Sequence, residues 1–465
     1  MTDWIGAAEA AQRLGIKQAS LYAYVSRGVL SRRREADGRA SMFDADEVDE
    51  LARKGRPRRA GGGRTEILIE SALTEITSTT QRYRGYDATD LALRCSFEDV
   101  AMLLWTGSLP AGATGAARAG TGVAGSGAGI GAAGAGVGVA GAVLGAGTAG
   151  TDLAAGRGGD WQATAEALGA GRAAQAALPA GTLPLERLQV IVPALAATDQ
   201  FRLHLDLPAV VQAGKALVAG MAGALPDARP APGPAGAGLP GSGSSGSGSP
   251  DTSPAVAARL APKLCAGPVP PGLIRVLNAA LVLVADHELA ASTLAARVAA
   301  SMRADPYAVV ATGLGAMGGA LHGGAELGAE LMLGSANSPA DAPRVVGDLL
   351  RRGEKLPGFG HFVYQDGDPR ANLLLRLISE FAPDSPQLAI ARAVTDEAHR
   401  RALPEPNIEF ALAVLARVAG MIRGSGEAIF ATGRTAGWLA HALEEYERNI
   451  PIRPRSIYTG PTAMT

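Results

Sequence analysis

The chain has 465 residues with 43 basic and 44 acidic side chains, so it is long enough for two or three domains and net charge does not dictate its partner. Its two cysteines, Cys95 and Cys265, are too few and too far apart for a disulfide framework or a thiolate metal site, which favours a reducing cytoplasm. The N-terminus lacks an export pattern and no window of about 20 residues is apolar without Gly or charge, so we expect a cytoplasmic protein outside membranes.

The sequence predicts a small helical domain with a β-hairpin in residues 1–60. A short amphipathic helix from Ala7 is followed by a turn at Gly15 and by a second helix that begins near Lys17. The dipeptide Asp37-Gly38 is a strong hairpin signal and predicts a β-wing, after which a third helix begins at Ala45. This order of elements resembles a winged helix-turn-helix domain of the MerR type.

The basic side chains of this head favour double-stranded DNA as a partner. Residues 1–64 hold 13 Lys or Arg against 9 Asp or Glu, whereas the rest of the chain is acidic. The candidates for the major groove and for phosphate contacts are Gln18, Ser20, Tyr22, Arg27, Arg32, Arg33, Arg34 and Arg39. The alternative is a packing module whose arginines are merely solvated, and a second basic run at 53–64 fits either a DNA-contacting extension or a flexible linker.

Two low-complexity tracts divide the remaining body. A Gly/Ala-rich tract at 111–160 and a Pro/Gly/Ser-rich tract at 226–254 lack large apolar side chains, and we expect both to be disordered insertions. The body then consists of 65–110, 161–225 and 255–465. Its apolar residues recur at helical spacing, as in WLAHALEEYERN, and alternating strand patterns are scarce beyond residue 60, so the sequence predicts an all-α body.

Three histidines fall in a window of 75 residues, each beside glycine or charge: His287 in ADHELAAST, His322 in GGALHGGAELG and His361 in GFGHFVYQDGDPR. Glycine lets a ligand approach the backbone and leaves ring nitrogens accessible. Their spacing fits no compact metal motif, so we expect no metal. Arginines in DPRA, ATGRTAGW and IPIRPRS suggest a substrate with several carboxylates, because a guanidinium binds a carboxylate through two hydrogen bonds.

Taken together, these motifs resemble those of the citrate synthase family, which includes 2-methylcitrate synthase. The matching runs are RYRGYDATDLA, DHELAASTLAARVAASMRADPYAVVATGLGAMGGALHGGA, PGFGHFVY with DPRA, PNIEF, and GRTAGWLAHALEE with IRPRSIYTGP. They occur in the family's order within residues 67–110 and 255–462. The resemblance implies an all-α homodimer with large and small helical domains. It also implies condensation of acetyl-CoA, a co-substrate, with oxaloacetate, without a metal or a tightly bound cofactor.

The resemblance also assigns roles by matching motif. His322 would stabilise the enol of acetyl-CoA, His361 would protonate the oxaloacetate carbonyl, and Glu409 would take the position of the family's aspartate base. The substrate-binding residues would be His287, Arg370, Arg434 and, from the partner subunit, Arg453. The backbone that faces CoA would be Leu356, Pro357, Gly358, Phe359 and Gly360, with Lys355 a weaker candidate for a phosphate.

Three departures from the family pattern bear on activity. Glu409 is one methylene longer than aspartate, Phe362 replaces a frequent arginine, and Glu326 replaces an asparagine. If Glu326 approached His322, it would raise the proton affinity of that histidine. Two alternatives to the citrate synthase interpretation stay open. One is a DNA-binding regulator whose body senses oxaloacetate or acyl-CoA, with catalysis weakened by Glu409 and Phe362. The other is a 2-methylcitrate synthase that uses propionyl-CoA.

Overall fold

The structure is a computed structural model that describes residues 4–14, 30–34, 41–53, 68–110, 161–228 and 255–455. The chain divides into two compact units, Met1–Glu70 and Ser71–Thr465. The Gly/Ala-rich tract predicted at 111–160 lies outside the described residues. The tract predicted at 226–254 also lies outside the described residues, except for 226–228. These three residues come after a helix and have no regular secondary structure.

The first unit is built on a small antiparallel sheet. Its elements are β1 (Trp4–Gly6), α1 (Ala7–Arg13), β2 (Arg32–Arg34), β3 (Ser41–Asp44) and α3 (Ala45–Arg53), with strand order β1-β3-β2. Asp44 caps α3, because its carboxylate accepts hydrogen bonds from the backbone N–H groups of Asp46 and Glu47. Ile5, Phe43 and Val48 form a separate apolar core. The predicted second helix and the Asp37-Gly38 turn lie outside the described residues.

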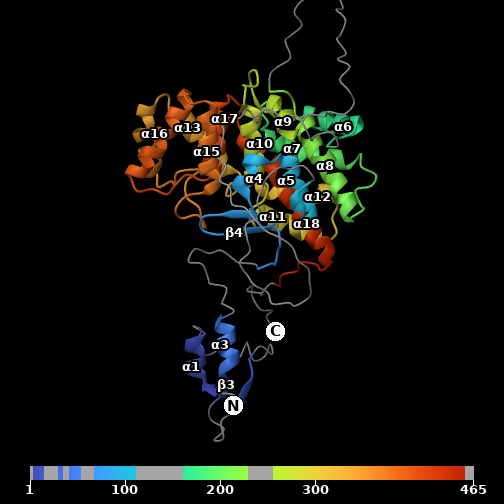
Figure 1. The fold of residues 1–465 in the computed structure, drawn as a ribbon, viewed down its shortest axis with the longest axis vertical. Helices are drawn as coiled ribbons and strands as arrows, with labels where there is room; N and C mark the ends of the chain where they lie inside the picture. Colours follow the sequence, from blue (N-terminus) through green and yellow to red (C-terminus); the bar gives the residue numbers. More distant parts are fainter. Residues whose placement is uncertain are drawn as a thin grey trace, which may run out of the picture. The chain divides into compact units, whose positions relative to one another are not determined.

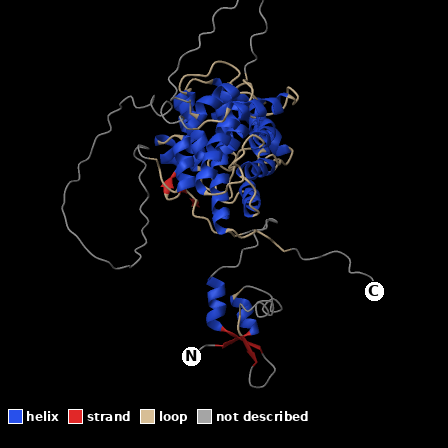
Figure 2. Ribbon diagram, turned by 90° about the vertical axis from the view of Figure 1, so that its right-hand side faces the viewer, coloured by secondary structure: helices blue, strands red, loops and turns tan. Residues whose placement is uncertain are grey.

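The second unit, which we call the body, is mostly helical, as predicted, and Figure 2 shows helices throughout it. Figure 1 labels most of its helices. The helices are α4 (Ala88–Arg94), α5 (Phe97–Thr106), α6 (Ala165–Ala176), α7 (Pro184–Ala196), α8 (Leu207–Ala224), α9 (Val256–Leu264), α10 (Leu273–Leu283), α11 (Ala291–Ser301), α12 (Pro306–Met317), α13 (Gly324–Gly334), the 3-10 helix η1 (Pro339–Asp341), α14 (Ala342–Arg351), α15 (Pro369–Phe381), α16 (Pro386–Arg400), α17 (Ile408–Val418) and α18 (Ser425–Arg448).

The all-α prediction missed one small sheet at the start of the body. Strands β4 (Thr74–Ile76), β5 (Gln81–Tyr83) and β6 (Tyr86–Asp87) pair antiparallel in that order. The tight turn between β5 and β6 is formed by Arg84 and Gly85, which have φ angles of 47° and 86°. Strands of two or three residues are too short to produce an alternating pattern, so they could not be predicted from periodicity.

Helix α18 is the centre of the body. It packs against α5, α7, α8, α10, α11, α12, α13 and α17, and it is buried on all sides from Ser425 to Ala442. Gly433 and Gly437 allow the close approach of α10 and the chain after it. A Cβ on Gly437 would lie 2.4 Å from the carbonyl oxygen of Ala285, to which the Gly437 N–H donates a hydrogen bond.

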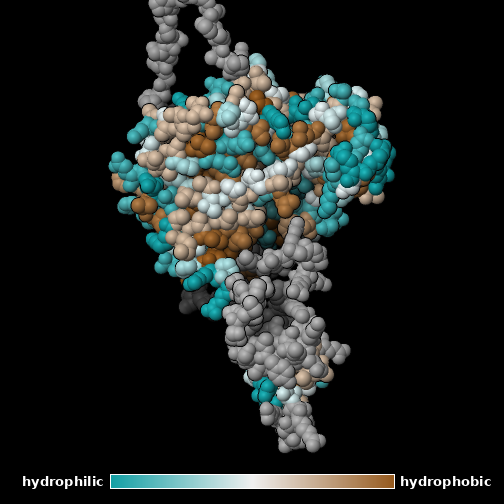
Figure 3. Space-filling model, turned by 180° about the vertical axis from the view of Figure 1, so that it is seen from behind, coloured by the Kyte–Doolittle hydropathy of each residue, from teal (hydrophilic) through white to brown (hydrophobic). Residues whose placement is uncertain are grey.

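Helix α8 is long and apolar enough to cross a membrane by length and composition alone, yet 61% of it is buried inside the body. Buried core helices of soluble proteins pass the same test, and α8 packs against α6, α7, α9 and α18. Figure 3 shows one face of the molecule, on which hydrophilic and hydrophobic residues are interspersed. Burial of α8 among other helices therefore accounts for its apolar composition.

Candidate active site

The loop before His361 is shaped by two glycines and held against the start of α17. Gly358 and Gly360 have φ angles of 79° and 80°, and a Cβ on Gly358 would lie 2.8 Å from the Cβ of Phe410. The Gly360 N–H donates to the Glu405 carbonyl at 2.7 Å, and the Asn407 N–H donates to the Gly358 carbonyl at 2.9 Å. Of the residues predicted to face CoA, Lys355 is exposed and Leu356 is buried.

The imidazole of His361 is oriented by the backbone that follows it. Its Nδ1 accepts hydrogen bonds from the N–H groups of Val363 at 3.1 Å and Tyr364 at 3.3 Å. The neutral ring therefore carries its proton on Nε2. The ring is stacked against Tyr364 at a centroid distance of 4.7 Å and against Phe362 at 4.8 Å. This arrangement leaves His361 suited to donate a proton through Nε2.

His287 lies edge-on to His361, with ring centroids 5.2 Å apart, and its Nε2 is 3.3 Å from the hydroxyl of Tyr364. Burial lowers the pKa of His287 well below its ordinary value, and the charges of Arg370 and Arg434 lower it further. His287 is consequently neutral near pH 7, and it can bind a substrate by hydrogen bonding but not by charge.

Asp286, directly before His287, ties this cluster to the first strand of the body. The hydroxyl of Thr74 donates to its Oδ2 at 2.5 Å, and Nε2 of His441 lies 3.2 Å from its Oδ1. Burial opposes the charge of Asp286, but His441 and Arg434 outweigh it and lower the pKa of the carboxyl. A buried carboxylate thus balances part of the positive charge of the cluster.

Arg370 and Arg434 are both buried. Arg370 forms a two-point ion pair with Asp368, with Nε to Oδ1 at 2.9 Å and Nη2 to Oδ2 at 2.7 Å. Arg434 donates through Nε to the Val284 carbonyl at 2.7 Å, and its guanidinium lies 4.6 Å from the ring centre of Phe430. Nη1 of Arg434 has no hydrogen-bond partner among the described residues. A guanidinium with a spare buried donor is suited to bind a carboxylate.

His322 lies in the turn that leads into α13, and Ser292 of α11 fixes its ring. The Ser292 hydroxyl is 2.8 Å from Nε2 of His322, so Nδ1 is the ring nitrogen that remains for a ligand. Burial lowers the pKa of His322 to about 4, with a further contribution from Arg434. The neutral ring can therefore act as a hydrogen-bond donor near pH 7.

Glu409 is the second residue of α17. Its Oε2 is enclosed and has no hydrogen-bond partner among the described residues. Removal from water raises the pKa of Glu409 above its ordinary value, although Arg370 acts in the opposite direction. A carboxylate with one unpaired oxygen and a raised pKa is a stronger base than an exposed glutamate, as general-base catalysis requires.

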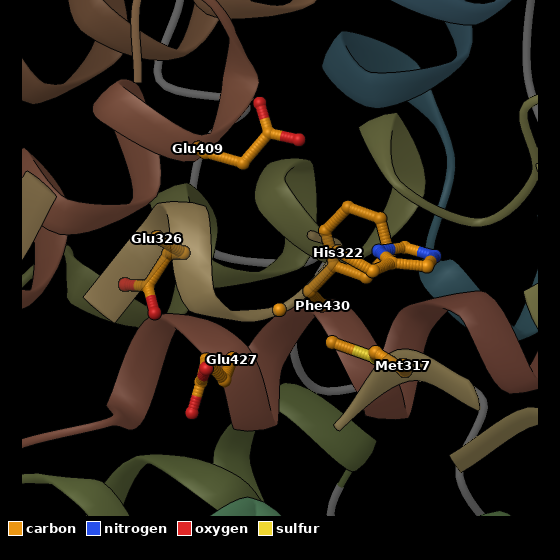
Figure 4. A pocket seen from close by; sticks show the side chains of 7 residues that line it. Met317, His322, Glu326, Glu409, Glu427 and Phe430 are labelled. Carbon is orange, nitrogen blue, oxygen red and sulfur yellow. The ribbon is translucent and has the colours of Figure 1, made fainter. Parts of the chain in front are cut away.

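His322 and Glu409 line one cavity. Figure 4 shows Glu409 on one side of it and His322 on another. The cavity has about 210 Å³ of empty space, including the part open to solvent, and its other lining residues are Met317, Gly323, Glu326, Glu427 and Phe430. Among the described residues, no group of three His, Cys, Asp or Glu side chains is placed to hold a metal ion.

The structure corrects the expectation for Glu326. Its carboxyl does not charge His322, whose pKa is lowered and not raised. Figure 4 shows the carboxyl of Glu326 extending toward Glu427, away from the His322 ring. Its Oε1 lies so close to Gly426 that a Cβ there would be 1.8 Å away. Glu326 therefore belongs to the contact between α13 and the start of α18.

Two predicted binding residues lie apart from the cluster. Lys355 and Arg453 are exposed, and Arg453 lies after α18 in the segment 451–455, which has no regular secondary structure. The structure contains one chain, so the contribution of Arg453 to a partner's site stays a prediction. Conversely, the sequence analysis assigned no role to Ser292, Tyr364 or Asp368. All three lie inside or beside the motifs of His287, His361 and Arg370, which was the available signal.

Few of the predicted DNA-binding side chains can be placed. Gln18, Ser20, Tyr22, Arg27 and Arg39 lie outside the described residues, as does the side chain of Arg34. Arg32 and Arg33 lie on β2, where both are exposed. The guanidinium of Arg33 is 4.4 Å from the ring centre of Trp4, so this arginine also has a packing role inside the unit.

The chain was compared with families of known proteins and with solved structures. The model of a family described as "Citrate synthase, C-terminal domain" matches residues 63–120 and 163–455. The citrate synthase of Haloferax volcanii is 31% identical over 403 residues, which cover 85% of this chain and 94% of that relative. "Citrate synthase 2" of Bacillus subtilis is 38% identical over 191 residues, but the match covers 40% of this chain and about half of that relative, 51%.

Solved structures show the same fold. The citrate synthase of Thermotoga maritima superposes with a TM-score of 0.62 at 24% identity, over 87% of this chain and 97% of that one. The Thermoplasma acidophilum enzyme, solved as a ternary complex with carboxymethyl coenzyme A and oxaloacetate, has a TM-score of 0.61 at 22% identity, over 86% of this chain and 95% of that one. The family model matches well over half of the chain, and the match with the Haloferax relative covers 94% of that protein, so the chain belongs to the citrate synthase family.

Proposed function

We propose that this chain condenses acetyl-CoA with oxaloacetate and then hydrolyses the thioester to release citrate and CoA. The observation that carries the proposal is the cavity lined by both Glu409, whose Oε2 has no hydrogen-bond partner among the described residues, and the neutral ring of His322. The Thermoplasma relative of the same fold binds a CoA derivative and oxaloacetate, which supports this pair of substrates.

The chemistry explains why these groups are needed. The methyl group of a thioester is a very weak acid, so Glu409 can remove its proton only if a donor stabilises the developing enolate oxygen. His322 supplies that donor through Nδ1. The new carbon–carbon bond forms when the enol attacks the ketone of oxaloacetate, whose oxygen takes a proton from Nε2 of His361. Water then attacks the thioester carbonyl, the carbon–sulfur bond breaks, and CoA leaves as the thiol.

Oxaloacetate would be held by His287, Arg370 and Arg434. A neutral imidazole donates one hydrogen bond, and the two guanidinium groups orient the carboxylates and oppose their charge. The reaction transfers no electrons, so it requires acetyl-CoA only as a co-substrate and no tightly bound cofactor. The glycine-containing backbone of 356–360 is the proposed surface for CoA.

The proposal is tested by measuring CoA release from acetyl-CoA with and without oxaloacetate, for the wild type and the Glu409→Asp variant. We expect oxaloacetate-dependent release by the wild type. If the wild type shows none and the aspartate variant does, the natural chain is not an enzyme. The same assay with propionyl-CoA tests the 2-methylcitrate synthase alternative, because one extra methylene changes kcat/KM by about 10- to 200-fold in a pocket that discriminates.

We also propose that the body functions as a homodimer and that Arg453 reaches the site of the partner subunit. Its exposed position after α18 is compatible with that role. The check is a mixed dimer in which one subunit carries Arg453→Ala and the other Glu409→Gln. A shared site predicts that one of its two sites keeps both native residues and stays active, whereas a site within one subunit predicts that no site is intact.

For the first unit we propose a winged helix-turn-helix domain of the MerR type that binds double-stranded DNA. The antiparallel strands β2 and β3 with exposed Arg32 and Arg33 support this proposal. Binding to DNA from upstream of its own gene should weaken steeply with salt, because phosphate contacts release counterions. Retention that ignores salt would leave the unit as a packing module. DNA binding together with an inactive body would instead support the regulator alternative.

A cytoplasmic location is the last part of the proposal. The cysteines Cys95 and Cys265 are both buried and neither is in a disulfide, which suits a reducing compartment. Fractionation of cells that express the full chain tests this location. Recovery of the protein from the membrane fraction or from the medium would contradict it.

A further inference from the structure

Asp368 makes more contacts than its place in the DPRA motif indicates. It is the N-cap of α15, and its carboxyl group is buried. Oδ1 accepts hydrogen bonds from the backbone N–H of Arg370 at 3.0 Å and from its Nε at 2.9 Å. Oδ2 accepts from Nη2 of Arg370 at 2.7 Å and from the backbone N–H of Ile408 at 3.1 Å. One carboxylate therefore binds the start of α15, a guanidinium and the start of α17.

The contact with Ile408 links two parts of the site that are far apart in sequence. Ile408 is the first residue of α17 and directly precedes Glu409. Arg370 is two residues beyond Asp368 and lies close enough to Glu409 to lower the pKa of that carboxyl. The carboxylate of Asp368 thus contacts both the guanidinium and the residue that directly precedes Glu409.

We propose that Asp368 is a positioning residue of the condensation, which fixes the base Glu409 relative to the substrate-binding Arg370 without touching substrate itself. The inference rests on the proposed citrate synthase function. A misplacement of about 1 Å at reacting groups can lower a rate about a hundredfold, so an error in this distance is costly.

A purely structural role for Asp368 makes a different prediction. Asparagine is as good an N-cap as aspartate, so a cap alone would survive Asp368→Asn. The amide, however, has one acceptor oxygen and no charge. If that oxygen caps α15, the amide NH2 group faces Nη2 of Arg370 and the Ile408 N–H, which are donors themselves, and both of these hydrogen bonds are lost. The two roles are therefore separated by variants that change one contact at a time.

The sharpest variant is Ile408→Pro, which removes the backbone N–H that donates to Asp368. Proline is well tolerated at the first position of a helix, and Asn407 before it has φ −113° and ψ −177°, an extended conformation that a following proline accepts. Ile408→Ala truncates the same buried side chain but keeps the N–H, so it is the matched control. We expect kcat of Ile408→Pro to be about tenfold or more below that of Ile408→Ala. Equal kcat values would overturn the inference.

A second measurement does not depend on turnover. Asp368→Asn leaves the guanidinium of Arg370 without its ion pair, so calorimetry should show about tenfold weaker oxaloacetate binding than in the wild type. Asp366→Asn, an exposed substitution in the same loop, is the control that should bind as the wild type does. Equal binding by Asp368→Asn contradicts the inference. If the wild type neither binds oxaloacetate nor turns over, the proposed function fails and the inference falls with it.

Discussion

Glu409 stands at the second position of α17, where the helix start is held by the Asn407 cap and by Asp368. The backbone cannot shift freely to compensate for a different side-chain length. Glu409→Asp should therefore draw the carboxylate back by about 1 Å and lower kcat about a hundredfold. Glu409→Gln removes the base and should lower kcat by about 100- to 10,000-fold. Steady-state kinetics at saturating oxaloacetate measure both, and an unchanged kcat in the glutamine variant would exclude Glu409 as the base.

The pH dependence of the reaction should report Glu409 and not His287 or His322. The pKa of His322 is lowered to about 4 and that of His287 lies well below its ordinary value, so both rings are already neutral near pH 7. Glu409 has a raised pKa and must be deprotonated to act. We expect kcat/KM for acetyl-CoA to rise with pH along a limb whose midpoint lies above the ordinary value for glutamate. A midpoint at or below that value would contradict this assignment.

The site residues that the sequence identified are those whose motif carries its own signal. His287, His322, His361, Arg370 and Arg434 stand in runs rich in glycine or charge, and the structure places them in neighbouring positions. Ser292 and Asp368 received no role, because each acts on a residue of another element. Sequence spacing does not reveal that Ser292 meets His322 or that Asp368 meets Ile408, since both contacts depend on tertiary packing.

The contact between α13 and α18 concentrates three acidic side chains. Glu326 and Glu330 of α13 lie at the start of α18, where Glu330 accepts a hydrogen bond from the Gly424 N–H at 2.9 Å and Glu427 adds a third carboxyl. Burial and the neighbouring carboxyls, Glu330 first, raise the pKa of Glu326 well above its ordinary value. Burial, Glu330 and Glu186 raise that of Glu427 to about 7, and Arg423 opposes the shift.

This cluster should make the body less stable as the pH rises. The pKa values of Glu326 and Glu427 are higher in the folded state than in the unfolded chain. Their contribution to the free energy of unfolding is therefore complete at a pH below the unfolded pKa values, and it is lost as the pH rises through the folded pKa values, from about 5 to above 7. Glu326→Gln cannot ionise, so the melting temperature of this variant should fall less between pH 5 and 9. Glu166→Gln, an exposed change on α6, is the control. Parallel curves for Glu326→Gln and wild type would disprove the role of the cluster.

The glycines of α18 are expected to be necessary where the helix meets α10. A Cβ on Gly437 would lie 2.4 Å from both the Ala285 carbonyl oxygen and Oδ1 of Asp286, so Gly437→Ala should destabilise the body by about 1–3 kcal/mol. Gly315 on α12 has no atom within 4 Å of an added Cβ, and Gly315→Ala should stabilise by about 0.5–1 kcal/mol. Chemical denaturation measures the free energy of unfolding of both variants. If Gly315→Ala destabilised the body as much as Gly437→Ala, the contact of Gly437 with Ala285 and Asp286 would not be the cause.

Element prediction succeeded where periodicity was long and failed where it was absent. Helices of 10 or more residues were visible as a helical body, whereas β4, β5 and β6 were too short to alternate. The stretch WLAHALEEYERN was predicted to be helical from its apolar spacing, and it forms the end of α18, a helix that is buried on all sides from Ser425 to Ala442. A single face cannot be read from a helix that has neighbours all around it.

At the scale of the whole chain, the two units have separate cores. Phe43 and Val48 belong to the core of the first unit, and no residue of that core is part of the large apolar core of the body. Phe43→Ala should therefore unfold the first unit, since loss of a buried phenylalanine costs about 3–5 kcal/mol, and leave oxaloacetate-dependent CoA release within about twofold of wild type. Calorimetric scans of the Phe43→Ala variant should lack the unfolding transition of the first unit. A large loss of CoA release would show that the body needs a folded first unit.

The hydrogen bond from Thr74 to Asp286 has a practical consequence for shortening this chain. The backbone N–H of Ala72 and the hydroxyl of Ser71 bond Glu444 of α18, and Thr74 reaches the residue next to His287. Three residues at the start of the body are thus hydrogen-bonded to α18 or to the residue that precedes His287. A truncated chain keeps these hydrogen bonds only if it starts at or before Ser71. A truncation that removes the first unit should therefore not extend past Glu70.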